Sequence, residues 1–238
     1  DAKSRQIQIT VKSGGLKSLQ IIDNGTGIQK SDLEILCERF TTSKLREYED
    51  LLKMQTYGFR GEALASISMI SRLTIQTKTR NEVVAYKSQY ENGIMLDEPK
   101  AVAGNQGTTI IIEDLFYNVP IRQKKSPTEE FGRIFEVVSK YAVHNFSVSF
   151  TLKKHGENNS IRTQASPTPV EIIRTIYGNE VANSLLKVTA ESEDLKFKMN
   201  GFISEAEYSN KKGQFLLFIN HRLVESKTLK KALFEYLY

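Results

Sequence analysis

The 238-residue sequence has one cysteine, three histidines and no long apolar run. The single Cys37 excludes a disulfide framework and is typical of a reducing compartment. His144, His155 and His221 lack a ligand-like spacing with Cys37, so the sequence does not predict a zinc site. No stretch approaches the roughly 18 apolar residues of a membrane span, and no charged-then-apolar leader opens the chain, so we expect no membrane partner.

What remains is the composition of a globular protein, with 39% hydrophobic and 26% charged residues. The length accommodates one large domain, or one of ordinary size with a smaller one. A net charge of +5 permits contact with nucleic acid without requiring it. The chain begins at Asp1-Ala2-Lys3 without an initiator methionine, so we expect it to be a fragment.

Apolar periodicity predicts an α+β protein. Alternation indicates strands at 5–11, 19–21, 72–79, 83–90, 107–113, 147–153 and 160–163. The run at 107–113 is nearly continuous in Thr and Ile, which predicts a strand buried on both faces. Helical spacing indicates a short helix opened by a capping box at Ser31, a second helix at 62–71, and a long amphipathic helix at 128–145.

Two prolines within residues 165–169 mark the best linker candidate, because proline resists both helix and central strand. Beyond the linker we expect a helix ending near Gly178, strands around 195–208 and 214–220, and a terminal helix from about Ser226. The predicted organisation is a larger domain over residues 1–165 and a truncated one over 166–238.

The first candidate site is the motif Asp23-Asn24-Gly25-Thr26-Gly27, which follows a strand. A carboxylate fixed at a strand end can accept a hydrogen bond from an exocyclic amine such as that of adenine, and the glycines allow a ligand to approach the backbone closely. The same residues are also ideal for a plain turn, and from this segment alone the turn is the commoner interpretation.

The second candidate site precedes a predicted helix and reads Gly58-Phe59-Arg60-Gly61-Glu62-Ala63-Leu64. Glycines before a helix start expose free N–H groups that suit a phosphate, and Arg60 can add a charge-assisted contact. The alternative is an ordinary glycine-containing helix entry in which Glu62 only complements the dipole.

Two smaller groups lie near these motifs in the sequence. Thr42, Ser43 and Lys44 offer hydroxyls and an ammonium suited to a triphosphate, although the solvated end of a helix is their default interpretation. Thr108, after Gly107, can place a hydroxyl at a base ring, although Gly-Thr is more often a simple strand entry.

Basic residues gather toward the C-terminus, where residues 206–238 carry a net charge of +3. Arg222, Lys227, Lys230 and Lys231 are the candidates for a DNA-binding surface. A solvated face is the commoner interpretation of such a run.

Taken together, the motifs resemble a known family. Asp23-x-Gly25-x-Gly27 resembles the second motif of the GHKL ATPases, which include type II topoisomerases, Hsp90 chaperones, histidine kinases and MutL mismatch-repair proteins. Residues 40–44, 58–64, 107–108 and 115–120 are similar to the MutL proteins specifically. Residues 37–40, 144–145 and 218–226 are similar to eukaryotic MutL homologues of the first class.

This resemblance implies a Bergerat-type (GHKL) α/β sandwich followed by a truncated ribosomal-S5-like α/β domain. It implies an ATPase that uses ATP and Mg2+, in which Asp23, Gly25 and Gly27 bind adenine. Residues 42–44 and 60–64 would hold phosphates and ribose, Gly58 and Phe59 would also belong to the cofactor site, and residues 41–60 would form a lid. For this chain the resemblance implies action in the nucleus as an ATP-gated dimerising clamp that couples mismatch recognition to downstream repair. The implied partners are a second MutL-homologue subunit in a heterodimer, MutS-type mismatch-recognition proteins and DNA.

The resemblance also places three functional residues outside the sequence. The family's general-base Glu and magnesium-binding Asn would lie upstream of Asp1, and a phosphate-contacting Lys would lie beyond Tyr238. We therefore assign no catalytic residue or metal ligand within the chain and expect it to hydrolyse ATP poorly by itself. Two rival interpretations remain: a non-catalytic GHKL-fold interaction module, and a GHKL ATPase of the chaperone or topoisomerase type.

Overall fold

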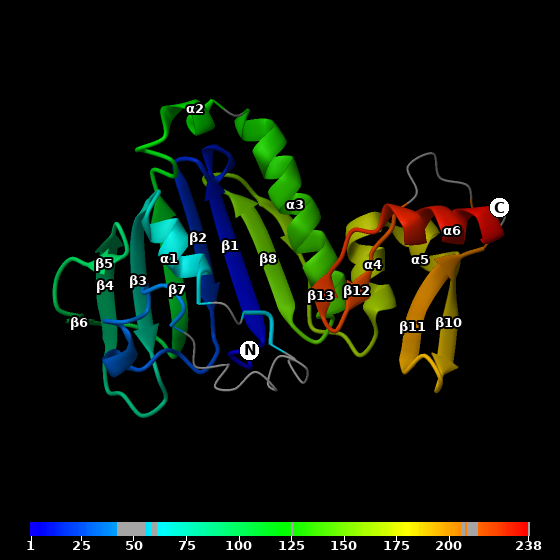
Figure 1. Cartoon of the computed structure of the whole chain (residues 1–238), viewed down its shortest axis with the longest axis horizontal. Helices are drawn as coiled ribbons and strands as arrows, with labels where there is room; N and C mark the ends of the chain where they lie inside the picture. Colours follow the sequence, from blue (N-terminus) through cyan, green and yellow to red (C-terminus); the bar gives the residue numbers. More distant parts are fainter. Residues whose placement is uncertain (42–55, 59–60, 125, 206–207, 209–213, 238) are drawn as a thin grey trace.

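The first two thirds of the chain form a nine-stranded mixed sheet (Figure 1). The computed structural model describes residues 1–41, 56–58, 61–124, 126–205, 208 and 214–237. The strand order is β5-β4-β3-β7-β2-β1-β8-β9, and β6 also pairs with β4. The strands are β1 (Gln6–Lys12), β2 (Ser18–Asp23), β3 (Arg72–Lys78), β4 (Ala85–Glu91), β5 (Ile94–Met95), β6 (Lys100–Val102), β7 (Gly107–Glu113), β8 (Ser149–Lys154) and β9 (Asn159–Arg162).

The strands expected at 5–11 and 19–21 are confirmed as β1 and β2, which pair as an antiparallel hairpin. A 3-10 turn, η1 (Ser13–Gly15), joins the two strands, and Ile9 lies opposite Ile21. Pairing is antiparallel throughout the described sheet except between β1 and β8, which run parallel. The expected strands at 72–79, 83–90, 107–113, 147–153 and 160–163 are confirmed within a few residues.

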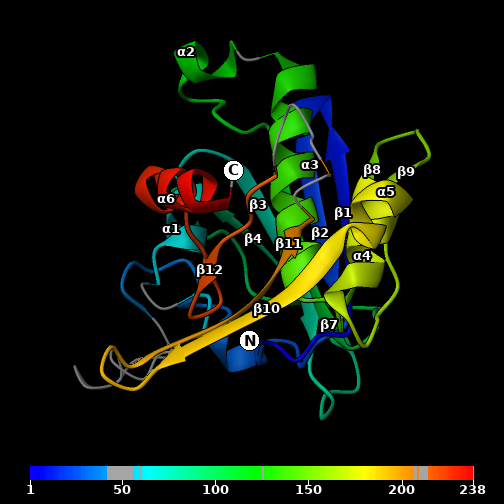
Figure 2. The same ribbon diagram turned by 90° about the vertical axis from the view of Figure 1, so that its right-hand side faces the viewer.

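Helices cover one face of this sheet (Figure 2). They are α1 (Ala63–Ser68) and the long α3 (Pro127–His144), whereas the single-turn α2 (Pro120–Gln123) is exposed and lies beyond the ends of the strands. The apolar side of α3 packs on β1 and β8, where Val138 and Ala142 meet the buried Val11 and Leu152. This packing confirms the helical spacing at 128–145, since burying such a stripe is what stabilises an amphipathic helix.

The prediction of a short helix that begins at Ser31 is wrong. The structure has a 3-10 turn there, η2 (Lys30–Asp32), with a hydrogen bond from Leu33 N to Lys30 O at 3.3 Å and no side-chain cap. Leu33 is nevertheless fully buried, and its carbonyl accepts a 2.7 Å hydrogen bond from the buried Tyr90 hydroxyl. This contact with β4 holds the segment in place, so a local capping signal does not decide its conformation.

The prediction that the 107–113 strand is buried on both faces is also wrong. β7 is central in the sheet, between β2 and β3, yet Thr109 and Ile111 are only half-buried. The reason is that helices cover a single face, on which Thr108 and Ile112 are buried.

The last third of the chain begins after β9. Its elements are α4 (Pro169–Tyr177), α5 (Asn179–Asn183), β10 (Leu185–Ser192), β11 (Phe197–Ser204), β12 (Phe218–Ile219), β13 (Arg222–Leu223) and α6 (Lys227–Leu237). β10 and β11 form one two-stranded sheet, and β12 and β13 form another. Ile172 of α4 is 2% exposed and lies in the core beneath α3, so the two predicted domains share apolar contacts at their junction. The boundary at residue 165 stays a prediction.

Candidate functional site

Asp23 stands at the end of β2, between Ile7 of β1 and Thr108 of β7. Its Oδ1 accepts a 2.7 Å hydrogen bond from the Gly25 N–H, which closes a turn immediately after the strand. Within the part of the chain that the structure describes, no hydrogen bond to Oδ2 of Asp23 is found. One oxygen therefore serves the turn that the local sequence favours, and the other remains at the strand end for a further donor.

The turn after Asp23 is fixed to the neighbouring strands by threonines. The Ile28 N–H donates to Oγ1 of Thr77 at 2.8 Å, and that hydroxyl donates in turn to the Gly107 carbonyl at 3.1 Å. Oγ1 of Thr108 lies 3.2 Å from Oγ1 of Thr77, and both side chains are buried. Thr108 thus supports the turn from behind. Thr77 was missed by sequence reasoning, although a hydroxyl that continues the buried face of Leu73 and Ile75 is a usable signal.

Two further residues that sequence reasoning missed hold the same turn. Oδ1 of Asn24 accepts hydrogen bonds from the Arg5 and Gln6 N–H groups, each at 2.9 Å. Nε2 of Gln106 donates to the Gly25 carbonyl at 3.1 Å. These contacts position the loop independently of any ligand.

The second glycine motif is described in part. Phe59 and Arg60 lie outside the described residues, as do Thr42, Ser43 and Lys44. Gly61 has φ +62°, and a Cβ there would lie 2.7 Å from the carbonyl carbon of Thr41, so this position favours glycine. Glu62 then precedes α1, which begins at Ala63 and turns Leu64 half into the interior.

The first residues of the chain bring the two motifs together. The Asp1 carboxylate accepts hydrogen bonds from the Tyr57 N–H at 3.1 Å and from the Gly58 N–H at 3.3 Å. The next carbonyl, of Ala2, accepts the Thr26 N–H at 2.9 Å. The Asp23 turn and the start of the Gly58 motif are therefore neighbours, as two walls of one site require.

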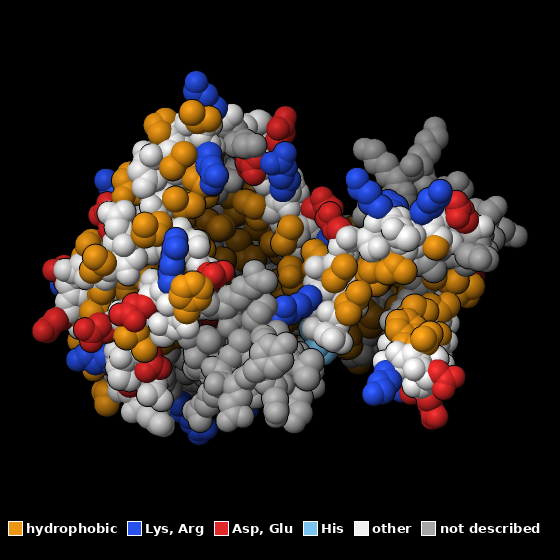
Figure 3. Space-filling model, viewed as in Figure 1, with side chains coloured by type: hydrophobic (Ala, Val, Ile, Leu, Met, Phe, Trp, Pro, Cys, Tyr) orange, Lys and Arg blue, Asp and Glu red, His pale blue; other side chains and the backbone are white. Residues whose placement is uncertain are grey.

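An apolar hollow lies between α1 and α3 on the helix-covered face of the sheet (Figure 3). Strand residues Ile7, Leu19 and Ile21 belong to the core on this face but are only half-buried. An apolar recess with a few polar groups at its edge is the usual form of a small-molecule site.

A metal-binding cluster is not found within the described ranges, where no three His, Cys, Asp or Glu side chains are placed to hold an ion. The same part of the chain contains no helix long and apolar enough to cross a membrane.

The C-terminal basic residues separate into two groups. Lys227, Lys230 and Lys231 are exposed on α6, and Lys231 forms an ion pair with Glu235 at 3.5 Å. Arg222 on β13 is half-buried instead, and its Nη2 donates to the Thr56 carbonyl at 3.3 Å.

Two family models match separate parts of the chain. Residues 1–103 match the family described as "Histidine kinase-, DNA gyrase B-, and HSP90-like ATPase". Residues 173–237 match "DNA mismatch repair protein, C-terminal domain". The chain is 46% identical to "DNA mismatch repair protein MLH1" of Saccharomyces cerevisiae, covering 98% of this chain and 31% of that protein. It is 37% identical to "DNA mismatch repair protein MutL" of Staphylococcus carnosus, covering 99% of this chain and 36% of that protein.

Solved structures agree with these relatives. The N-terminal domain of a DNA repair protein superposes with a TM-score of 0.82 at 31% identity, covering all of this chain and 75% of that one. The Aquifex aeolicus MutL ATPase domain complexed with ADP gives a TM-score of 0.72 at 24% identity, covering 99% and 81%, and this likeness shows the fold. The chain spans about a third of the length of the curated relatives it matches. It belongs to the MutL family of DNA mismatch repair proteins, as their GHKL ATPase domain followed by a portion of the S5-like domain.

Proposed function

We propose that this chain binds ATP as the nucleotide-binding region of a mismatch-repair clamp that dimerises when loaded. The observation that carries the proposal is the Asp23 carboxylate, held at the end of β2 with Oδ1 in its turn and no described contact on Oδ2. Support comes from the ATPase family that matches residues 1–103 and from the ADP complexed with the Aquifex aeolicus domain of the same fold.

In this proposal Asp23 accepts a hydrogen bond from the exocyclic amine of adenine through Oδ2. Gly25 and Gly27 let the base approach the backbone, because neither carries a Cβ. Thr108 acts indirectly: its hydroxyl contacts that of Thr77, which in turn accepts a hydrogen bond from the Ile28 N–H and so holds the turn in place.

The phosphates and ribose are assigned to the second motif. The Gly58 N–H already donates to Asp1, so Gly58 is assigned to this motif from the family resemblance alone. Gly61 and residues 62–64 present backbone N–H groups where α1 begins, and the first N–H groups of a helix lack partners within it. Because α1 has only six residues, we assign the contact to these N–H groups and not to a helix dipole. Thr42, Ser43, Lys44, Phe59 and Arg60 are assigned from the family resemblance alone.

Magnesium has no ligand set of its own among the described residues, so no step is assigned to it here. When bound with ATP, this ion neutralises phosphate charge. Family resemblance places its Asn ligand and the general-base Glu upstream of Asp1. We expect ATP hydrolysis in a version extended upstream and little in the chain itself. Absence of hydrolysis and of ATP-dependent dimerisation in both would favour the non-catalytic interaction module.

Asp23→Asn tests the adenine assignment. The amide keeps an oxygen for the Gly25 N–H but removes the charge, and a hydrogen bond to a charged group contributes about 1.5–3 kcal/mol, or roughly 10- to 100-fold in affinity. We expect ADP affinity to fall by that factor while the denaturation midpoint changes little. Asp97→Asn is the matched control, because Asp97 is exposed near β6 and forms a surface ion pair with Lys100 at 3.2 Å. Equal affinity in the Asp23 variant and the control would refute the assignment.

The clamp proposal includes a second MutL-homologue subunit as heterodimer partner, MutS-type proteins, DNA, and action in the nucleus, all from the family. Family membership removes support for a chaperone or topoisomerase.

For DNA contact we retain Lys227, Lys230 and Lys231, because Arg222 is half-buried against Thr56. Lys227→Glu with Lys230→Glu should lower DNA affinity and reduce its salt slope by about two. The exposed pair Lys12→Glu with Lys100→Glu is the control, and equal effects in both pairs would exclude α6 as the contact.

A further inference from the structure

The β12–β13 hairpin of the S5-like portion docks onto the C-terminal end of α3 (Figure 1). Phe218 of β12 stacks on the ring of His144, with centroids 4.0 Å apart and planes 7° from parallel. It also meets Tyr141 edge to face at 5.7 Å. Nδ1 of His221, in the hairpin turn, lies 3.1 Å from Nε2 of His144. The hairpin is therefore attached by ring packing and a side-chain hydrogen bond.

The same end of α3 holds the segment at residues 56–58. The Tyr57 hydroxyl donates to Oδ1 of Asn145 at 3.0 Å, and its ring meets Tyr141 edge to face at 5.8 Å. Asn145 is itself oriented by a hydrogen bond from its Nδ2 to the Tyr141 carbonyl at 2.9 Å. Tyr141 thus lies between Tyr57 on one side and Phe218 on the other.

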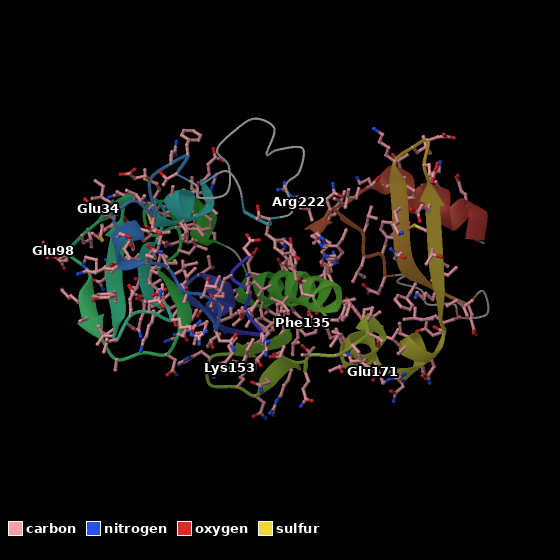
Figure 4. All side chains as sticks on the ribbon, turned by 90° about the horizontal axis from the view of Figure 1, so that it is seen from below. Glu34, Glu98, Phe135, Lys153, Glu171 and Arg222 are labelled. Atoms are coloured by element: carbon pink, nitrogen blue, oxygen red, sulfur yellow. The ribbon has the colours of Figure 1, made fainter. Side chains whose placement is uncertain are left out.

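Arg222 makes the direct connection between the hairpin and this segment (Figure 4). Its guanidinium donates to the Thr56 carbonyl at 3.3 Å, across 166 positions of sequence. The next two N–H groups, of Tyr57 and Gly58, donate to Asp1. Through Ala2, the neighbour of Asp1, this segment is joined to the turn that contains Asp23.

The hairpin turn is strained in a way that serves this contact. Asn220 and His221 both have positive φ, +48° and +66°, which is the geometry of a type I′ turn. Asparagine tolerates this region, whereas a histidine adopts it less readily than a glycine. A strained residue whose side chain makes a specific contact points to a function for that contact. Here the contact is the one between His221 and His144.

From these contacts we infer that the β12–β13 hairpin is a positioning element of the nucleotide site, with Arg222 as a positioning residue that holds Thr56, Tyr57 and Gly58 in place. The inference rests on the proposed function, in which Gly58 begins the phosphate-binding motif. In this inference Arg222 acts on the protein segment and not on the nucleotide itself. It fixes the segment that leads into the motif, so nucleotide binding and the docking of the S5-like portion favour each other.

The test uses the full-length protein that contains this chain and three variants. Arg222→Ala removes the guanidinium, and Arg222→Lys keeps a charged donor. Arg174→Ala is the matched control, because Arg174 is also half-buried but bonds Asn183 at 2.8 Å within the α4–α5 pair. We expect Arg222→Ala to weaken ADP affinity roughly five- to tenfold, which is less than the loss of a direct contact, because Arg222 acts only by holding the segment that leads into the phosphate-binding motif. Arg222→Lys should recover most of it, and Arg174→Ala should change nothing.

A second variant separates positioning from stability. His221→Gly relieves the backbone strain but removes the ring that contacts His144, so the denaturation midpoint should stay level or rise while ADP affinity falls. Hydrogen exchange at the Tyr57 and Gly58 amides without nucleotide gives a readout that does not depend on the proposed function. It should accelerate at least fivefold in Arg222→Ala and not in Arg174→Ala. Unchanged exchange at both amides would overturn the inference, even if ADP binding itself is confirmed.

Discussion

Gly27, in the turn after β2, offers a sharp test of how the candidate site is built. Its φ of +76° lies in the left-handed region, and a Cβ there would overlap the Lys78 carbonyl oxygen and lie 2.6 Å from its carbon. Lys78 is the last residue of β3 and pairs with Gly107 of β7, so its backbone is held by the sheet. The new Cβ and the Lys78 carbonyl therefore cannot move apart without a shift of backbone that the sheet holds in place.

Gly27→Ala should therefore destabilise the fold. The left-handed conformation costs an alanine about 1–2 kcal/mol, and a forced backbone shift costs about 1–3 kcal/mol more. We expect a loss of about 2–5 kcal/mol in the free energy of unfolding, measured by urea denaturation. The midpoint should fall while the slope with denaturant stays constant, because the surface exposed on unfolding is unchanged.

Gly132→Ala is the matched control for this experiment. Gly132 lies on the exposed side of α3, and a Cβ there would meet no atom within 4 Å. The same substitution should raise stability by about 0.5–1 kcal/mol, because glycine is unfavourable inside a helix. A Gly27→Ala protein as stable as the wild type, beside a stabilised Gly132→Ala, would refute the reasoning about the turn.

Three further outcomes are expected. Burial raises the pKa of the Cys37 thiol to about 11, so alkylation at pH 8 should be slow in the native protein and fast in urea. Tyr90→Phe removes the shorter of two hydrogen bonds to the buried Leu33 carbonyl, leaving the one from the Leu36 N–H at 3.4 Å, and should cost about 0.5–1.5 kcal/mol in a denaturation experiment. Burial first, and then the nearby His221, lower the pKa of His144 from 6.5. The unfolded chain binds this proton more readily, so the contribution is present above pH 6.5 and lost below it. His144→Gln should flatten the fall in stability between pH 6.5 and 5.

Local patterns predicted the sheet and its long helix well, because their signal lies within a few residues. The alternation of Ile7, Ile9 and Val11 with their partners contains both the strand and its buried face. The spacing of apolar residues along α3 likewise indicates which side of the helix packs on the sheet. The fold class followed from these elements, and the motifs identified the family.

What the sequence could not predict depends on contacts between distant residues. The conformation after Ser31 is decided by Tyr90, 57 positions away from Leu33. β10 lacks clear alternation because most of its side chains are exposed, so only its pairing with β11 defines it. The site shows the same limit. Asp1 reaches the Gly58 motif through hydrogen bonds that span 56 and 57 positions, and the Ala2 carbonyl reaches the Asp23 turn, so no local pattern signals that the two motifs are neighbours.

Asp23 shows why the turn and the ligand interpretations of one motif are not exclusive. The hydrogen bond from the Gly25 N–H to Oδ1 fixes the carboxylate before any ligand arrives. A fixed carboxylate loses less side-chain entropy on binding, so the turn itself prepares Oδ2 to accept a donor. An alanine at this position would remove both functions together and would not distinguish them. Asparagine retains an acceptor for the turn and removes the charge, so it separates a residue that only shapes the loop from one that binds the nucleotide.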